Sequence, residues 1–423
     1  MKRRTFINKA LLTSAGLNFV PELFGVPLNR IFSEVKVRPI TNGPKFHWFG
    51  YYDKFQFDTS GRYALGMAVD FEGRSPVADD VIEIGMVDLQ DNDKWIKLGE
   101  SSSWGWQQGC MLQWLPGSSD EIIWNDCEDG QLISRILNYK TGKMRNLPKP
   151  VYTLDPSGRW AIGTEFSRIQ KLRPGYGYAS VPDPYEAVKA PKEIGLYKMD
   201  LKSGEHKMLF SLAEIAAIPY QGKELDEYWH WFNHLLVNTD GSRFTFLHRW
   251  REKTNEGKFA SGGFVTRMFT ADSDGKDLYE IDPSGFTSHF IWRDPNHICA
   301  FTKPAGREMG FYIIEDKTGK VEQIGKTKMP TNGHQTYLPQ HNNEWLVNDS
   351  YPLEDRLQHL YLYHIPSDKR IDLGKFKSPP AYTGELRCDL HPRTNRMGNK
   401  IIIDSTHGGN GRQMYLIEID SLK

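Results

Sequence analysis

Long apolar runs, basic blocks and closely spaced cysteines are scarce in this sequence, and each shortage excludes a class of protein. No segment reaches the roughly 18 apolar residues that a membrane-spanning helix needs. Lys and Arg together number 53, as do Asp and Glu, and no basic block follows the N-terminus, which argues against a nucleic-acid partner. The four cysteines, at positions 110, 127, 299 and 388, include no C-x-x-C pair. Cys110 and Cys127 flank one expected strand, where an exported protein permits a disulfide.

The first 33 residues have the composition of an export signal followed by a short linker. Arg3, Arg4 and Phe6 form a pair-plus-aromatic pattern like that of the twin-arginine signal, and a short apolar stretch follows. We expect the mature protein to begin between residues 22 and 34 and to be exported or periplasmic. The alternative is an ordinary amphipathic N-terminal helix. Because no cysteine precedes Cys110, a lipid anchor is not expected.

From residue 34 to residue 423 one pattern returns seven times, and it predicts a single domain. Each copy is a turn rich in Asp, Pro, Asn or Gly followed by a short apolar strand. The copies begin at residues 58, 115, 155, 238, 294, 338 and 391. Each copy is followed, some tens of residues later, by a strand in which apolar and polar residues alternate and which usually ends in a polar turn. This pattern is typical of β-hairpins. Such a repeat is typical of an all-β, seven-bladed β-propeller. Residues 34–40 are expected to close the last blade, and residues 212–218 to form a helix.

Aromatic residues are abundant, at 13% of the chain, and they concentrate in residues 45–54. Aromatic faces beside hydrogen-bonding groups suit a sugar-binding site. The alternative is a strand whose aromatic side chains fill the interior. The stretch contributes these candidates: His47, Trp48, Tyr51, Tyr52, Asp53 and Lys54.

A propeller brings corresponding positions of different blades together around one axis, so residues far apart in sequence can share a site. Histidines recur just before the turn-and-strand phrases, at His234, His289, His334 and His391, although each alone could be a core residue. Arg173, Tyr176 and Arg249 add cations and a phenol, and arginine pairs well with the carboxylate of an acidic sugar. His289, His334 and His391 could also hold a divalent metal ion, because neutral imidazole is a common ligand.

Two reaction types suit this set of residues. A lyase acting on a uronic acid needs a cation or metal for the carboxylate, a base for the C5 proton and an acid for the leaving oxygen. A hydrolase normally needs two carboxylates flanking the bond. The acids here, Asp53, Glu165 and Asp389, are scattered along the sequence and form no evident pair.

Four phrases in the chain resemble a group of seven-bladed propeller enzymes from glycan-degrading Bacteroidetes. They begin at His47, Trp106, Arg173 and Cys388. The group includes the α-L-rhamnosidases of glycoside hydrolase family 145 and, more distantly, the ulvan and oligogalacturonate lyases. The resemblance extends over essentially the whole mature chain.

The resemblance implies removal of rhamnose linked α-1,4 to glucuronic acid, as in arabinogalactan side chains, with His47 as the catalytic histidine. Such a hydrolase requires no cofactor. The ulvan-type lyases use paired histidines, and this chain has Gln107, Gln108, Asn125 and Asp126 where one would be expected. We therefore expect an exported rhamnosidase. The alternatives are a lyase acting on a uronate glycan, with or without a metal ion, and a non-catalytic glycan-binding propeller.

Overall fold

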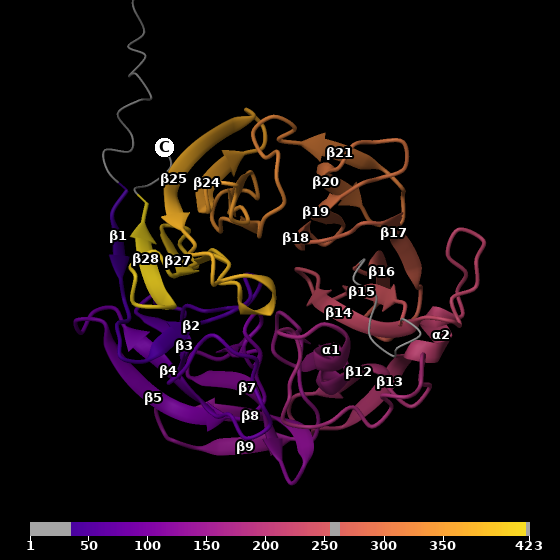
Figure 1. Ribbon diagram of the computed structural model, residues 1–423, viewed down its shortest axis with the longest axis horizontal. Helices are drawn as coiled ribbons and strands as arrows, with labels where there is room; N and C mark the ends of the chain where they lie inside the picture. The colour runs from indigo at the N-terminus through magenta and orange to yellow at the C-terminus, as the bar shows by residue number, and fades with distance from the viewer. Residues whose placement is uncertain (1–34, 254–262, 420–423) are drawn as a thin grey trace, which may run out of the picture. The chain divides into compact units, whose positions relative to one another are not determined.

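The computed structural model describes residues 35–253 and 263–419, and the predicted export signal lies outside them. The residues from Val35 onward form one compact unit. In it, the described strands form seven four-stranded antiparallel sheets. Figure 1 shows the sheets arranged around a common centre as the blades of a propeller. The predicted all-β, seven-bladed β-propeller is therefore confirmed.

Each of the first three blades runs in chain order from its innermost to its outermost strand. Blade 1 consists of β2 (Phe46–Trp48), β3 (Tyr63–Val69), β4 (Ile82–Asp88) and β5 (Lys94–Ser101). Blade 2 consists of β6 (Gln113–Trp114), β7 (Glu121–Glu128), β8 (Gln131–Asn138) and β9 (Met144–Leu147). Blade 3 consists of β10 (Thr153–Leu154), β11 (Trp160–Gly163), β12 (Gly195–Asp200) and β13 (His206–Ser211).

Blades 4 to 6 repeat this order. Blade 4 consists of β14 (Trp229–Val237), β15 (Arg243–Arg251), β16 (Val265–Asp272) and β17 (Tyr279–Gly285). Blade 5 consists of β18 (Phe290–Asp294), β19 (His297–Thr302), β20 (Gly310–Glu315) and β21 (Val321–Ile324). Blade 6 consists of β22 (Thr336–Tyr337), β23 (Trp345–Asn348), β24 (Leu357–His364) and β25 (Lys369–Lys377).

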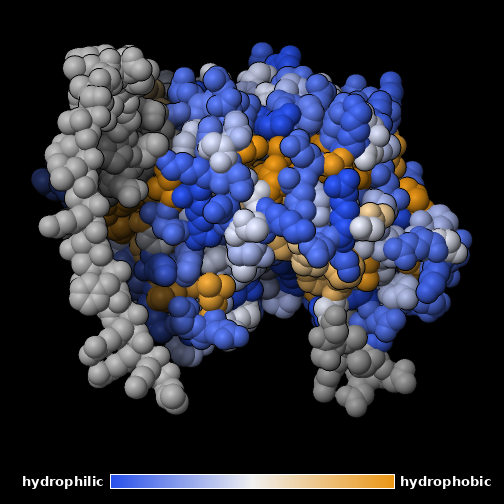
Figure 2. Space-filling view, turned by 90° about the horizontal axis from the view of Figure 1, so that it is seen from above, coloured by the Kyte–Doolittle hydropathy of each residue, from blue (hydrophilic) through white to orange (hydrophobic). Residues whose placement is uncertain are grey.

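Blade 7 joins the two ends of the described chain. It consists of β26 (Arg393–Thr394), β27 (Lys400–Ser405), β28 (Gln413–Glu418) and β1 (Val37–Pro39). In its register Val37 lies opposite Ile417, so the expected closing strand is present. Apolar residues of adjoining blades pack together, as where Met414 of β28 joins the core of blade 1. Hydrophilic residues cover most of the side of the molecule seen in Figure 2.

The described residues contain two short α-helices, and no described helix is long and apolar enough to cross a membrane. The expected helix is α2 (Leu212–Ala216), which begins with a capping box between Ser211 and Glu214. The helix α1 (Phe166–Leu172) was not predicted, and its N-cap Glu165 makes no side-chain capping bond. A single 3-10 turn, η2, spans Gly384–Leu386. All four cysteines are free thiols, Cys110 and Cys127 included.

The connections between strands divide the propeller into two faces. Those from a blade's second to its third strand, and from its fourth strand to the next blade, lie on one face, here called the loop face. The loop face carries the long segments 164–194, 349–356 and 378–392. The tight turns between other strands lie on the opposite face, here called the turn face. The loop face thus has most of the irregular chain that can build a site.

The aromatic stretch of blade 1 leaves the innermost strand and enters the centre of the ring. Trp48 pairs with Met67 in the β2–β3 register, and Leu65 next donates a hydrogen bond to Gln56. Residues 49–55 therefore stand opposite Gly66 alone. We call residues 49–55 the axial bulge, a large relative of the β-bulges that redirect side chains beside functional sites.

Candidate functional site

A buried ion pair from blade 7 holds the start of the axial bulge. The carboxylate of Asp404 accepts hydrogen bonds from the backbone N–H groups of Phe49, at 3.2 Å, and Gly50, at 3.0 Å. Arg393 donates to Asp404 at 2.7 Å and to the Gly50 carbonyl at 3.0 Å. Gly50 has φ +99°, and a Cβ there would lie 2.9 Å from a backbone carbon of Gln108. Glycine is required at this position by both conformation and space.

The two tyrosines at the tip of the axial bulge meet histidines from four blades. Tyr52 is fixed by its hydroxyl, which donates to the Phe290 carbonyl at 2.8 Å and accepts from the Phe290 N–H at 3.0 Å. The ring of Tyr51 lies 4.9 Å from His234 and 5.3 Å from His391. The ring of Tyr52 lies 5.4 Å from His334 and 5.9 Å from His289. The structure thus gathers these predicted residues around the axis.

Behind the tyrosines, Asp53 forms a buried group with Lys54 and His234. Its carboxylate lies 3.0 Å from Lys54 Nζ and 3.3 Å from His234 Nε2, and all three side chains are almost fully buried. Burial lowers the pKa of His234 to about 4, against the opposing effect of Asp53, so this imidazole is neutral at pH 7. Burial would raise the pKa of Asp53, but Lys54 and His234 outweigh it and the pKa is lowered.

His334, Asp389 and His391 form a compact donor group. One ligand atom from each lies within 4.8 Å of the others, and all three residues are buried. Two imidazoles and a carboxylate are suitable ligands for a divalent transition metal. The predicted ligands His334 and His391 are thus together, while Asp389, considered only as a scattered acid, completes the group. The ring of His289 lies 4.1 Å from that of His334.

Asp349 orients this donor group from outside. It accepts hydrogen bonds from the backbone N–H groups of His334, at 2.7 Å, and His391, at 3.1 Å. It also lies 2.9 Å from His334 Nδ1, which leaves Nε2 as the nitrogen available to a ligand. A carboxylate behind a ligating histidine is a common feature of metal sites. The residues present therefore fit a divalent ion.

Tyr176 connects the donor group to a cluster of arginines. The Arg173 guanidinium lies 3.7 Å from the centre of the Tyr176 ring, and Arg387 donates to the Tyr176 hydroxyl at 3.2 Å. Arg387 also donates to Asp389 at 2.9 Å. Burial would raise the pKa of Tyr176, but the charges of Arg173 and Arg387 outweigh it, and the pKa is lowered. Tyr176 therefore loses its proton more readily than an ordinary tyrosine.

Arg173 and Arg249 have no acidic partner within residues 35–253 and 263–419. Arg249 is 4% exposed, and its Nε donates to Thr266 at 3.1 Å while Nη1 has no partner among the described residues. Burial, followed by the charge of Arg173, lowers the pKa of Arg249 to about 9. Both guanidinium groups lie near the ring of Phe264, at 4.9 and 4.8 Å. A buried cation without a counter-charge is costly, so this pocket is suited to an anionic ligand.

Tyr351 and Asp349 were missed by sequence reasoning, which searched the residues before each turn-and-strand phrase. Both follow the second strand of blade 6, on the loop face. The Tyr351 hydroxyl lies 3.4 Å from His289 Nε2. Burial, and then the charge of Asp389, raises the pKa of Tyr351 well above its usual value. The Asp-Ser-Tyr sequence directly after a strand was the available signal.

Three predicted residues lie apart from the cluster. His47 on β2 makes a 3.0 Å contact to Gln413 through Nδ1 and packs against Trp95, with ring centres 5.0 Å apart. Trp48 packs among other indoles, 5.4 Å from that of Trp106. Glu165 is the N-cap of α1, and burial raises its pKa.

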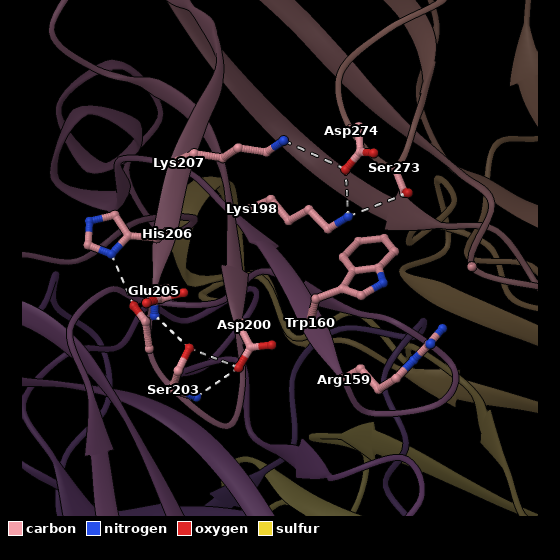
Figure 3. Close-up of a pocket in the computed structure, with 12 residues that line it drawn as sticks. Arg159, Trp160, Lys198, Asp200, Ser203, Glu205, His206, Lys207, Ser273 and Asp274 are labelled. Carbon is pink, nitrogen blue, oxygen red and sulfur yellow. Dashed lines mark hydrogen bonds and ion pairs between the residues drawn. The ribbon is translucent and has the colours of Figure 1, made fainter.

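A separate hollow of about 1100 Å³ lies on the turn face between blades 3 and 4 (Figure 3). Lys198 and Lys207 both point toward Asp274 there, at 3.0 and 3.7 Å. His206 contacts the carbonyl of Gly204 at 3.2 Å. These charges are satisfied by one another and exposed to water, unlike those of the central cluster, which is therefore the candidate site.

Neither a protein-family model nor a curated protein matches this chain. Among solved structures, it is similar to an oligogalacturonate lyase from Vibrio parahaemolyticus, with 14% identity over 92% of this chain and 95% of that one and a TM-score of 0.62. It is also similar to an oligogalacturonate lyase in complex with manganese, with 15% identity over 92% and 94% of the two chains and a TM-score of 0.63. At such identities the likeness shows the propeller fold alone.

Proposed function

We propose that this protein is a lyase that cleaves a uronate-containing oligosaccharide by β-elimination at the central cluster. One observation carries the proposal: Arg173 and Arg249, without acidic partners in the described chain, lie beside Tyr176, whose pKa is lowered. A uronate supplies the missing negative charge. The oligogalacturonate lyases that share the fold support this choice over a hydrolase.

The arginines would bind the carboxylate of the sugar to be cleaved. Guanidinium groups pair with carboxylates through parallel hydrogen bonds. When the C5 proton leaves, negative charge spreads onto that carboxylate, so cations held in a water-poor pocket stabilise the transition state more than the ground state. Arg249, whose Nη1 has no partner among the described residues, is the main candidate for this contact.

Tyr176 is the proposed base and Tyr351 the proposed acid. Environments that drive the pKa values of similar groups apart assign acid and base roles. The Tyr176 phenolate would take the proton from C5, and the C4–O bond would break as the C4–C5 double bond forms. Tyr351, kept neutral by a raised pKa, would give its proton to the leaving oxygen. After the reaction Tyr351 would be a phenolate and would take a proton from solvent, and His289, 3.4 Å from the Tyr351 hydroxyl, is placed to relay it.

A divalent metal ion is the proposed cofactor, held by His334, Asp389 and His391. When bound, it would neutralise the substrate carboxylate and the charge that develops on it. Asp349 holds the backbone of His334 and of His391, and it also contacts the His334 imidazole. Arg387, bonded to both Asp389 and Tyr176, couples the donor group to the base.

The rhamnosidase hypothesis depends on His47, and that residue lies outside the central cluster, against Gln413 and Trp95. Removal of rhamnose from glucuronate and glycan binding without catalysis therefore remain alternatives that the same assay addresses. Export to the periplasm also remains a proposal, supported by the first residues of the sequence.

The test is an assay of purified protein with manganese on two substrates, oligogalacturonate and a rhamnose-capped glucuronate oligosaccharide. We expect an unsaturated product that absorbs in the ultraviolet. Tyr176→Phe should lower kcat about 10²- to 10⁴-fold, the usual contribution of a general base. Tyr139→Phe, which removes a half-buried hydroxyl near the turn face, is the matched control. Free rhamnose that is lost in His47→Ala but not in Tyr176→Phe would overturn the proposal.

A further inference from the structure

A groove of about 640 Å³ lies on the loop face of blade 4, beside the central cluster. It is formed by the segment that precedes β14, the end of β15, the start of β16 and the end of β17. Five aromatic side chains line it: Tyr220, Tyr228, Trp250, Phe264 and Phe286. Its volume is within the range of small-ligand sites.

Phe264 joins the groove to the candidate site. The same ring that lines the groove lies 4.9 Å from the Arg173 guanidinium and 4.8 Å from that of Arg249. A sugar chain whose reactive uronate is bound by these arginines can therefore continue past Phe264 into the groove. Arg251, another lining residue, donates to the Leu172 carbonyl at 2.9 Å and ties the groove wall to α1.

The far end of the groove presents aromatic surface to water. Phe286 is 53% exposed, so a large part of its ring is available to a ligand in the groove. Tyr220 is positioned by its hydroxyl, which lies so close to Gly285 that a Cβ there would be 2.6 Å from it. Gly285 has φ +83°, so both space and conformation restrict the position.

Charge does not select the ligand of this groove. The described lining residues have as many positive as negative side chains, with Lys223 and Arg251 against Glu224 and Glu252. Recognition is left to the aromatic faces, which suit the C–H faces of sugar rings. We propose that the groove binds the sugar residues that flank the cleaved uronate, so that the protein acts on chains in preference to disaccharides. This inference rests on the proposed lyase function, which places the cleaved uronate at Arg173 and Arg249 and so leads the rest of the sugar chain toward the groove.

The test compares galacturonate oligomers of two to six units with the wild type, Phe286→Ala, Tyr228→Ala and the control Met309→Ala. Met309 is an exposed apolar residue, 47% accessible, that does not line the groove. We expect the groove variants to lower kcat/KM about 2- to 10-fold for the long oligomers, from the energy of one aromatic contact, and to leave the dimer unchanged. An equal loss at every length, or no loss, would overturn the inference.

Binding to the Tyr176→Phe variant, measured by calorimetry with the same oligomers, separates this inference from the proposed function. Affinity that rises with chain length and falls in Tyr176→Phe/Phe286→Ala supports the groove, even if no oligomer yields an unsaturated product. Affinity independent of both chain length and Phe286 overturns it, even if elimination occurs. Thermal unfolding should be nearly unchanged by Phe286→Ala because the side chain is half exposed.

Discussion

Replacing Arg393 by Met should destabilise the protein severely, because Arg393 and Asp404 fix the axial bulge from inside the core. The two side chains are 1% and 3% exposed. Arg393 donates to Asp404, the Gly50 carbonyl and Gln56, while Asp404 also accepts from the N–H groups of Phe49 and Gly50. Met keeps much of the volume but leaves the carboxylate buried without its counter-charge.

The magnitude follows from the burial of this pair. Breaking a buried ion pair by removing one partner costs about 3–5 kcal/mol, because the remaining charge is uncompensated. Arg62 provides the control in the same region of the molecule. It bonds Asp88 at 2.6 Å, and although the Asp88 side chain is only 5% exposed, that of Arg62 is 41% exposed and water can replace it beside the carboxylate, so Arg62→Met should cost at most about 1 kcal/mol.

Urea unfolding at neutral pH, followed by tryptophan fluorescence, measures both free energies. Arg393→Lys, which retains the charge but not the planar fork, should lie between the wild type and Arg393→Met. Equal losses for Arg393→Met and Arg62→Met would refute the reasoning that the buried pair anchors the bulge.

Three further predictions concern protons and metal. Burial lowers the pKa of His230 to about 4 and that of His248 well below 6.5, so the unfolded chain binds protons that the folded one does not. The free energy of unfolding should therefore fall as pH drops below 6.5, by about 2 kcal/mol near pH 5 from His230 and further from His248, and a flat urea-unfolding profile would contradict this. Because the pKa of Tyr176 is lowered, kcat/KM should rise with pH and level off below about pH 10, and Arg173→Gln should move this limb to higher pH. His334→Ala should weaken manganese binding at least about tenfold by calorimetry, and unchanged affinity would exclude it as a ligand.

The propeller could be predicted from the sequence because its signals are local. Each turn phrase and alternating strand lies within some tens of residues, and the count of seven required no long-range information. The closing strand was predictable for the same reason, since residues 34–40 alternate like a strand. The helix α1 could not be predicted in the same way, because no side chain caps its N-terminus. Its buried residues include Ser167 and Arg168 as well as apolar ones, so they do not form a simple apolar pattern.

The composition of the site was only partly predictable. The recurrence of histidines at one phase of the repeat indicated that His334 and His391 would meet. It could not select Asp389 over His289 as the third donor, because that depends on distances of a few ångströms across the axis. The axial bulge was equally hidden, since its aromatics suit a strand as well as a site and its anchor, Asp404, lies more than 350 residues away.

The path of the chain after Trp48 separates His47 from the central cluster. In the sequence His47 and Tyr51 belong to one aromatic phrase, and a common site was a natural hypothesis. In the structure the chain leaves the strand after Trp48, so Tyr51 meets His234 and His391 while His47 stays against Trp95. Four residues of sequence thus separate two different environments.

The most direct test of the central claim is the mass of the product formed in heavy-oxygen water. Elimination breaks the C4–O bond without adding water, so the account predicts an unsaturated uronate without heavy oxygen, formed by the wild type and lost in Tyr176→Phe. A saturated product that carries one heavy oxygen at the cleaved bond would show hydrolysis and contradict the account.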